Sequence, residues 1–216
     1  MAGAQVHLRG WLYGGRLVDG DVALRGIDGL YWRQTAPPYN PFIPEESAYG
    51  EGRYHRKDEK VAWYGAGCEM AAWAELQRLS GASTEHATRY LSCVRVRDVD
   101  VLDLTDSAVQ GILGNCTWGD LCADDYDFCQ SIASVAFASA VDGLLAPSAA
   151  LPGHSILVLR REVIYESRRV EEQYRRIGKP PATLARLRNQ VPKRAQRQVT
   201  GGSPRPSSEG ASAVHP

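Results

Sequence analysis

The sequence has no hydrophobic stretch long enough to cross a membrane, which needs roughly 18 apolar residues. Its longest apolar run extends from Ile132 to Val141, contains two serines and ends at Asp142. The first residues also lack a positively charged start followed by an apolar core, so we expect no secretory signal peptide. These absences predict a cytoplasmic protein that does not contact a membrane.

Cysteine and histidine do not occur with the spacing that metal sites need. The chain has five cysteines, an odd number, and no Cys-x-x-Cys. The five histidines are scattered along the sequence. A disulfide framework and a structural zinc site are therefore both disfavoured. We expect reduced thiols and no metal ion.

Two glycine motifs of common enzyme classes are absent as well. No Gly-x-Ser-x-Gly is present, which disfavours a serine hydrolase. No Gly-x-Gly-x-x-Gly follows a strand, because Gly65-Ala-Gly67 lacks the third glycine, and this disfavours a Rossmann oxidoreductase.

The net charge is zero, but the two parts of the chain have opposite balances. Residues 1–159 contain 12 Lys and Arg against 20 Asp and Glu, whereas residues 160–216 contain 13 against 5. A basic segment suits nucleic acid, a membrane surface or an acidic partner. No aromatic residue interleaves the arginines after Tyr174. We interpret the segment as a solvated helix face followed by a tail, and expect no direct binding of nucleic acid.

The length of 216 residues allows one sizeable domain. Glycine pairs in residues 1–27 predict a small hairpin or an arm. Residues 28–177 are expected to form the catalytic domain. Residues 178–216 are basic and rich in Pro, Gly and Ser, so we expect this tail to be disordered.

Hydrophobic periodicity predicts a mixed α+β domain. Strands are expected at 28–34, 61–64, 142–146 and 154–159. Residues 91–104 are expected to form two strands joined by a tight turn. Capping residues and helical spacing predict helices from Glu69 to Leu79, from Thr105 or Asp106 to Leu113, from Asp124 to about Ala140, and from Glu162 to Arg176.

Three polar residues lie at the ends of elements that are otherwise apolar. Arg33 carries a planar set of donors suited to phosphate or carboxylate. Glu75 lies among small and aromatic residues, and Ser148 follows a proline. Each has a structural alternative: a surface ion pair for Arg33, the edge of a polar helix face for Glu75 and a turn for Ser148.

The order of these residues resembles the RES-domain family, which is named for Arg, Glu and Ser. The resemblance covers roughly residues 28–160 and rests on their order and on the final string, which is specific. The matching segments are Tyr31-Trp-Arg33, Gly50-Glu-Gly52-Arg53-Tyr54, Trp63-Tyr64, Ala74-Glu75, Leu102-Asp-Leu-Thr-Asp106, Gln130 and Asp142-Gly-Leu-Leu-Ala-Pro-Ser148. The sequence departs from the family at His55-Arg-Lys-Asp58, where the family often has Asn-Pro and a glycine.

The resemblance implies an ADP-ribosyltransferase-like fold, with two small sheets and helices around a cleft that holds NAD. It implies a toxin that depletes NAD and is held in check by an antitoxin with a helix-turn-helix DNA-binding region. Glu75, Arg33 and Ser148 would be catalytic, and Arg33, Arg53, Tyr64 and Ser148 would contact NAD.

The acceptor of ADP-ribose stays open at this point. Water would make the protein an NAD glycohydrolase, and phosphate would make it a phosphorylase. A protein acceptor would make it an ADP-ribosyltransferase. A further alternative is a non-catalytic RES-like protein used for binding.

The composition of the tail predicts that its removal leaves the activity of the protein unchanged. A chain that ends at Arg194 should retain NAD turnover close to that of the full chain, because a segment rich in Gly, Pro and Ser buries too little apolar surface to offset its ordering entropy. Turnover of the two proteins can be compared directly. A large loss in a truncated protein that is still folded would mean that the basic segment builds part of the site.

Overall fold

The structure, a computed structural model, describes residues 4–42, 51–56, 62–80, 88–166, 168–181 and 184. The strands are β1 (Gln5–Leu12), β2 (Arg16–Ala23), β3 (Arg25–Thr35), β4 (Trp63–Ala66), β5 (Arg89–Asp103), β6 (Gly143–Pro147), β7 (Ser155–Leu159) and β8 (Val170–Gly178). The helices are α2 (Glu69–Ser80), α3 (Ser107–Ile112), α4 (Trp118–Cys122), α5 (Asp127–Ala138) and α6 (Arg161–Tyr165). The expected mixed α+β class is confirmed.

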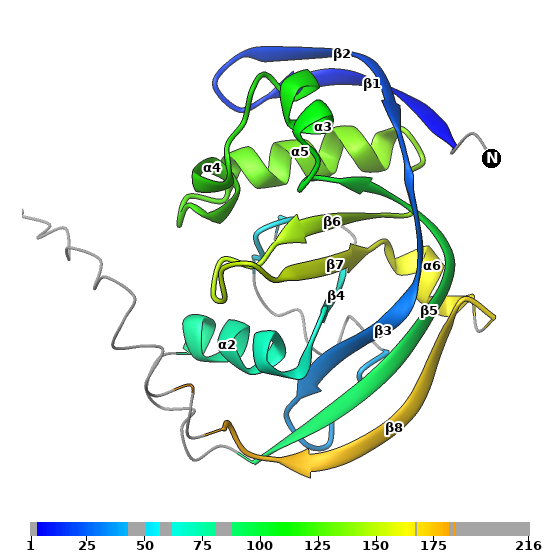
Figure 1. Ribbon diagram of the computed structural model, residues 1–216, viewed down its shortest axis with the longest axis vertical. Helices are drawn as coiled ribbons and strands as arrows, with labels where there is room; N and C mark the ends of the chain where they lie inside the picture. The colour runs from blue at the N-terminus through cyan, green and yellow to red at the C-terminus, as the bar shows by residue number, and fades with distance from the viewer. Residues whose placement is uncertain are drawn as a thin grey trace, which may run out of the picture.

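The main sheet closes on itself. Its order is β3-β4-β7-β6-β5-β8, and β3 also pairs with β5, so five of the six strands form a small barrel-like ring (Figure 1). The separate two-stranded sheet is the antiparallel hairpin β1–β2. The resemblance implied two small sheets, but it did not imply that the larger sheet closes. The closure depends on β5, which is paired along both of its edges.

Strand β5 corrects the prediction of two strands and a tight turn at 91–104. It is one strand of 15 residues. Its register against β3 shifts between Ile27 and Gly29, which pair with Val99 and Val96, and Asp98 has a φ of 50°. An extra residue in one strand is a β-bulge, which bends the strand without ending it. The alternation of valines in β5 changes phase between Val96 and Val99 because of this bulge, and the strand continues through it.

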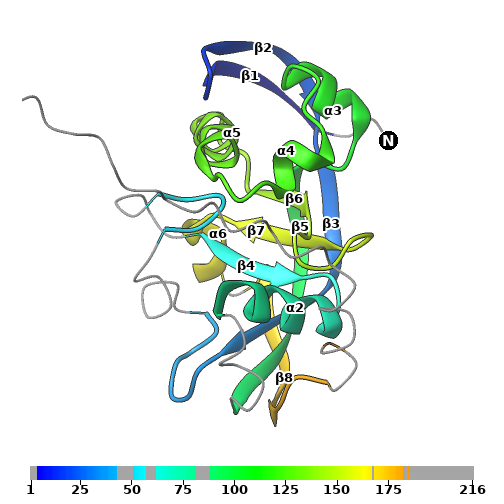
Figure 2. The same ribbon diagram turned by 90° about the vertical axis from the view of Figure 1, so that its left-hand side faces the viewer.

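Three apolar clusters fill the molecule. One lies inside the ring of strands, and its members include Tyr31, Trp63, Val94 and Leu157. A second joins the hairpin β1–β2 and helices α3, α4 and α5 to the outer side of β6 and β7. A third packs α2 against the outer side of β3. Figures 1 and 2 show the hairpin at one end of the molecule and β8 at the other.

The helix expected from Glu162 to Arg176 is wrong for most of its length. Helix α6 has only five residues, and β8 follows it and pairs with the edge of β5. Ladder hydrogen bonds to a long open edge outweigh the helical propensity of the charged residues. Part of the basic surplus is neutralised locally, because Arg169 pairs with Asp142 and Arg175 pairs with Glu172.

The remaining boundaries are close to those expected, with two differences. The helix expected from Asp124 begins at Asp127 and is preceded by the unexpected helix α4, which starts with a capping box between Thr117 and Asp120. The expected strand at 61–64 appears as β4, although Val61 lies outside the described residues. Most of the tail at 178–216 also lies outside them, so its disorder stays a prediction.

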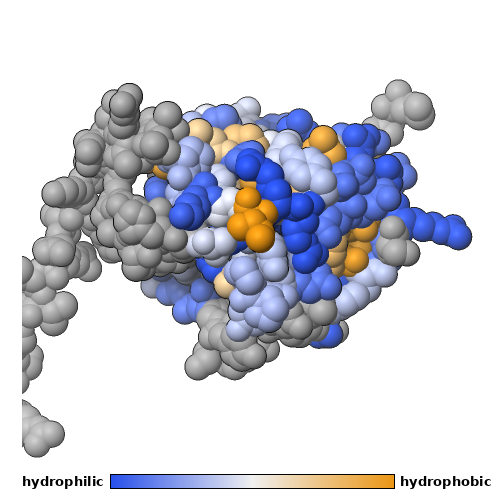
Figure 3. Space-filling view, turned by 90° about the horizontal axis from the view of Figure 1, so that it is seen from below, coloured by the Kyte–Doolittle hydropathy of each residue, from blue (hydrophilic) through white to orange (hydrophobic). Residues whose placement is uncertain are grey.

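The coloured part of the face seen from below is largely hydrophilic, with hydrophobic residues in small separate areas (Figure 3). Within the described ranges, no helix combines the length and the hydrophobicity needed to span a membrane.

The packing of the barrel predicts that alanine substitutions at two of its glycines differ strongly in their effect on stability. A Cβ on Gly143 would lie 2.4 Å from the carbonyl oxygen of Val158, whereas a Cβ on Gly26 would lie 3.8 Å from its nearest neighbour. Gly143→Ala should therefore lower the free energy of unfolding by about 1–3 kcal/mol. Gly26→Ala, in the same barrel, should change it by about 0.5 kcal/mol or less. Urea denaturation of both variants measures the difference, and equal stabilities would contradict the close packing of β6 on β7.

Candidate active site

Glu75 is carried by a helix whose buried alanines pack against the sheet. The first part of α2 is rich in alanine, and Ala71, Ala72 and Ala74 are buried. Small side chains allow the helix to approach β3, where the Gln34 amide donates to the carbonyl oxygen of Ala72. Glu75 follows these alanines and is only partly buried. The helix thus carries one carboxylate at the margin of an apolar contact.

Ser148 meets this carboxylate at the end of β6. The Ser148 hydroxyl donates to Glu75 Oε1 at 2.6 Å, and the backbone N–H of Ala150 also donates to Glu75 Oε1 at 3.3 Å. Ser148 Oγ accepts from the N–H of Leu151 at 3.0 Å, and its own N–H donates to the carbonyl of His154 at 2.8 Å. Glu75 is therefore held by neutral donors at the β6–β7 turn, which fix the carboxylate and do not cancel its charge.

Arg33 is placed by different neighbours. It lies on the same face of β3 as Tyr31, is 9% exposed, and its guanidinium carbon is 5.7 Å from the centre of the Trp63 ring. Burial lowers the pKa of Arg33 to about 10, and Tyr64 acts in the opposite direction. The side chain is therefore cationic at neutral pH although it is buried, which costs desolvation free energy.

Arg53 lies in a short turn that depends on Gln130. The Gln130 amide donates to Glu51 Oε1 at 2.7 Å and to the carbonyls of Gly52 and His55 at 3.0 and 3.2 Å. A Cβ on Gly52 would lie 2.1 Å from the His55 ring, so the turn needs glycine there. The helical glutamine thus fixes the turn that presents Arg53.

The guanidinium of Arg53 stands on the face of the Tyr126 ring, 4.8 Å from its centre. Its Nη1 donates to the carbonyl of Leu121 at 3.0 Å and to that of Ala123. Arg53 therefore ties the turn to the end of α4.

Tyr64, on β4, closes the other side of that turn. Its hydroxyl accepts from the N–H of Tyr54 at 3.0 Å and is 2.8 Å from Nδ1 of His55. Burial raises the pKa of Tyr64 far above its ordinary value. The phenol therefore stays protonated at neutral pH and acts only through hydrogen bonds and its ring.

Sequence reasoning missed three residues near Glu75. The Cys122 thiol is 3.9 Å from the carbonyl oxygen of Ser148, and burial raises its pKa. The nearby charges of Arg53 and Arg78 oppose that rise, and that of Glu75 adds to it. Arg78 Nη2 is 2.6 Å from Asp124 Oδ1. The spacing of three residues between Glu75 and Arg78 on one helix could have indicated that Arg78 lies near the site. No pattern in the sequence indicates its contact with Asp124.

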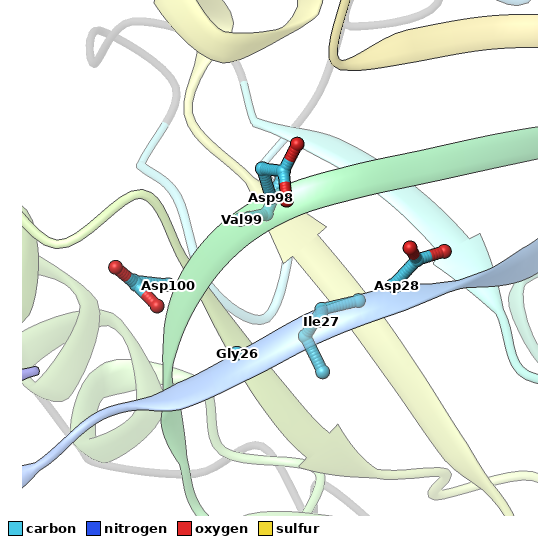
Figure 4. Close-up of a pocket in the computed structure, with 6 residues that line it drawn as sticks. All are labelled: Gly26, Ile27, Asp28, Asp98, Val99 and Asp100. Atoms are coloured by element: carbon cyan, nitrogen blue, oxygen red, sulfur yellow. The ribbon is translucent and has the colours of Figure 1, made fainter. Parts of the chain in front are cut away.

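A surface pocket lies apart from these residues, at the β5 bulge (Figure 4). The carboxylates of Asp28, Asp98 and Asp100 project around it from β3 and β5. Asp28 pairs with Arg95. No group of three or more possible metal ligands occurs in the part of the chain that the structure describes.

Comparison with known proteins identifies the family and the fold of the chain. Residues 23–195 match the family described as RES domain. The chain belongs to the RES-domain family. It also shares the fold of the toxin in the crystal structure of the M. tuberculosis MbcT–MbcA toxin–antitoxin complex, with a TM-score of 0.65 at 22% sequence identity. That match covers 77% of this chain and 92% of the other. Among curated proteins, no sequence matches this RES-domain chain.

Ser148 predicts a measurable contribution to stability. The residue is 2% exposed, and its hydroxyl bonds the Glu75 carboxylate and two backbone N–H groups. Ser148→Ala leaves these groups without that partner and should lower the free energy of unfolding by about 1–3 kcal/mol. Ser134→Ala, on the exposed side of α5, is the control and should change it by about 0.5 kcal/mol or less. If both variants unfold at the same urea concentration as the wild type, Ser148 does not hold Glu75.

Proposed function

We propose that this RES-domain protein consumes NAD by cleaving the bond between nicotinamide and ribose. The observation that carries the proposal is the 2.6 Å hydrogen bond from Ser148 to Glu75, which orients one carboxylate in the region of two arginines, Arg53 and Arg78. The same family membership supports an ADP-ribosyltransferase-like arrangement around an NAD cleft.

One carboxylate is sufficient for this reaction. The nicotinamide of NAD is a cationic pyridinium, so it leaves as a neutral base and needs no general acid, unlike the leaving group in ordinary glycoside hydrolysis. Positive charge then develops on the ribose. Glu75 stabilises that charge and holds a ribose hydroxyl, because its own hydrogen bonds are to neutral groups.

The other residues bind and orient the substrate. Arg33 and Arg53 supply positive charge for the pyrophosphate or the ribose side. Tyr64 offers an aromatic face to nicotinamide, and its protonated hydroxyl orients the ring through Tyr54 and His55. We assign Ser148 the role of positioning Glu75, through the hydrogen bond that its hydroxyl donates to the carboxylate.

We further propose that the protein is the toxin of a toxin–antitoxin pair. Its support is the shared fold with the toxin of the MbcT–MbcA complex. The partner would be an antitoxin with a helix-turn-helix region. Water and phosphate are the acceptors we favour. Turnover in phosphate buffer separates them, because a phosphorylase produces a phosphorylated ADP-ribose and a glycohydrolase produces ADP-ribose.

Glu75→Gln should be the most damaging isosteric substitution. It keeps the size of the side chain and much of its hydrogen bonding but removes the charge that faces the ribose. Loss of one preorganised electrostatic group costs on the order of 10²–10³ in rate. The measurement is the NAD turnover of the purified variant relative to wild type, with the melting temperature of each protein as a check of folding.

Glu69→Gln is the matched control, because Glu69 lies at the start of the same helix and pairs with Arg176. It should retain wild-type turnover. In a bacterial host, expression of the wild type should arrest growth, and expression of the Glu75→Gln protein should not. A folded Glu75→Gln protein with near wild-type turnover would overturn the proposed role of the carboxylate.

A further inference from the structure

An ion pair joins α2 to the segment between α4 and α5 beside Glu75. Arg78 lies three residues after Glu75, which places the two side chains on the same face of the helix. Arg78 Nη2 and Asp124 Oδ1 are 2.6 Å apart, and the side chains are 21% and 42% exposed. The pair is therefore both close to the candidate site and in contact with solvent.

The pair completes a ring of contacts around the site. Glu75 accepts from Ser148, the carbonyl of Ser148 contacts the Cys122 thiol, and Asp124 follows Cys122 by two residues. The charges of Glu75 and Arg78 both act on that thiol. In Figures 1 and 2, α2 and α4 lie on either side of the β6–β7 turn that carries Ser148. The Arg78–Asp124 contact thus bridges the two sides.

A second arginine faces the same region. Arg53 is 7% exposed, and its charge also acts on Cys122. Its Nη1 is bonded to two backbone carbonyls, whereas Nη2 has no hydrogen-bond partner among the described residues. A buried guanidinium with an unused N–H group costs free energy unless a further acceptor arrives. Two arginines, Arg53 and Arg78, and two carboxylates, Glu75 and Asp124, therefore lie in this region, and Arg53 still has an N–H group that a further acceptor can bind.

We propose that the Arg78–Asp124 pair is an electrostatic gate for a diphosphate group. In the free protein Arg78 pairs with the Asp124 carboxylate. The pyrophosphate of the substrate displaces this carboxylate and pairs with Arg78 in its place. A pyrophosphate carries two negative charges and several acceptor oxygens, so it binds a guanidinium more strongly than one carboxylate does. Arg78 is then a binding residue, and Asp124 is a positioning residue that acts through Arg78. The identity of the substrate rests on the proposed function; the gate needs only a diphosphate.

The test compares steady-state kinetics of four variants with wild type. Asp124→Asn removes the competing charge and should lower the KM for NAD about 1.5- to 5-fold, the range expected for an exposed ion pair, with the effect on KM rather than on kcat. Arg78→Gln should raise KM by at least as much. The double variant should behave like Arg78→Gln, because Asp124 acts through Arg78. Glu69→Gln, which removes the other ion pair of α2, should leave KM unchanged.

Calorimetric titration with inorganic pyrophosphate gives an independent readout. Its affinity should rise in Asp124→Asn and fall in Arg78→Gln by similar factors. If wild type leaves NAD intact but pyrophosphate affinity follows this order, the proposed function fails and the gate stands. If Asp124→Asn binds pyrophosphate no better than wild type, the gate is overturned, whatever happens to NAD. Asp124→Asn keeps the shape of the side chain, so the test does not depend on the folding of Arg78→Gln.

Discussion

The pairing of β5 along both of its edges is the constraint on which the structure depends. One edge binds β3, and the other binds β8 and then β6 in turn. The bulge at Asp98 lets one strand follow this curved path with its valines still facing the barrel interior. Arg33 is carried by β3, and Ser148 follows β6. The closure of the barrel therefore fixes where these two residues lie relative to each other and to α2.

Within this frame, charged groups of the site are held largely by neutral partners. Glu75 is bonded to a hydroxyl and a backbone N–H, and Arg53 is bonded to two carbonyls and stacked on Tyr126. Such partners fix geometry but leave net charge in place, which suits a site that must respond to a charged substrate. Arg78 differs because its partner is a carboxylate near the surface, and that contact is open to competition.

The sequence was sufficient for features that depend on local order. The alanine-rich helix at Glu75, the strand before Ser148 and a helix cap at Thr105 or Asp106 were predicted because spacing and capping residues encode them, and the cap is Asp106. Features set by distant partners were not predicted. Strand β8 forms because β5 offers an open edge, and that edge is visible only after the barrel closes. The resemblance implied only that Glu75 and Ser148 belong to one catalytic set. No local pattern shows their contact, because 73 residues separate them.

The most direct test of the central claim is the product formed from NAD by the purified wild-type protein, followed by proton NMR. The account predicts that free nicotinamide appears in step with the loss of NAD, because Glu75 stabilises the ribose cation as the neutral base departs. NAD that stays intact at enzyme-like protein concentrations, with no antitoxin present, would contradict the account and leave the RES-domain chain as a binding protein.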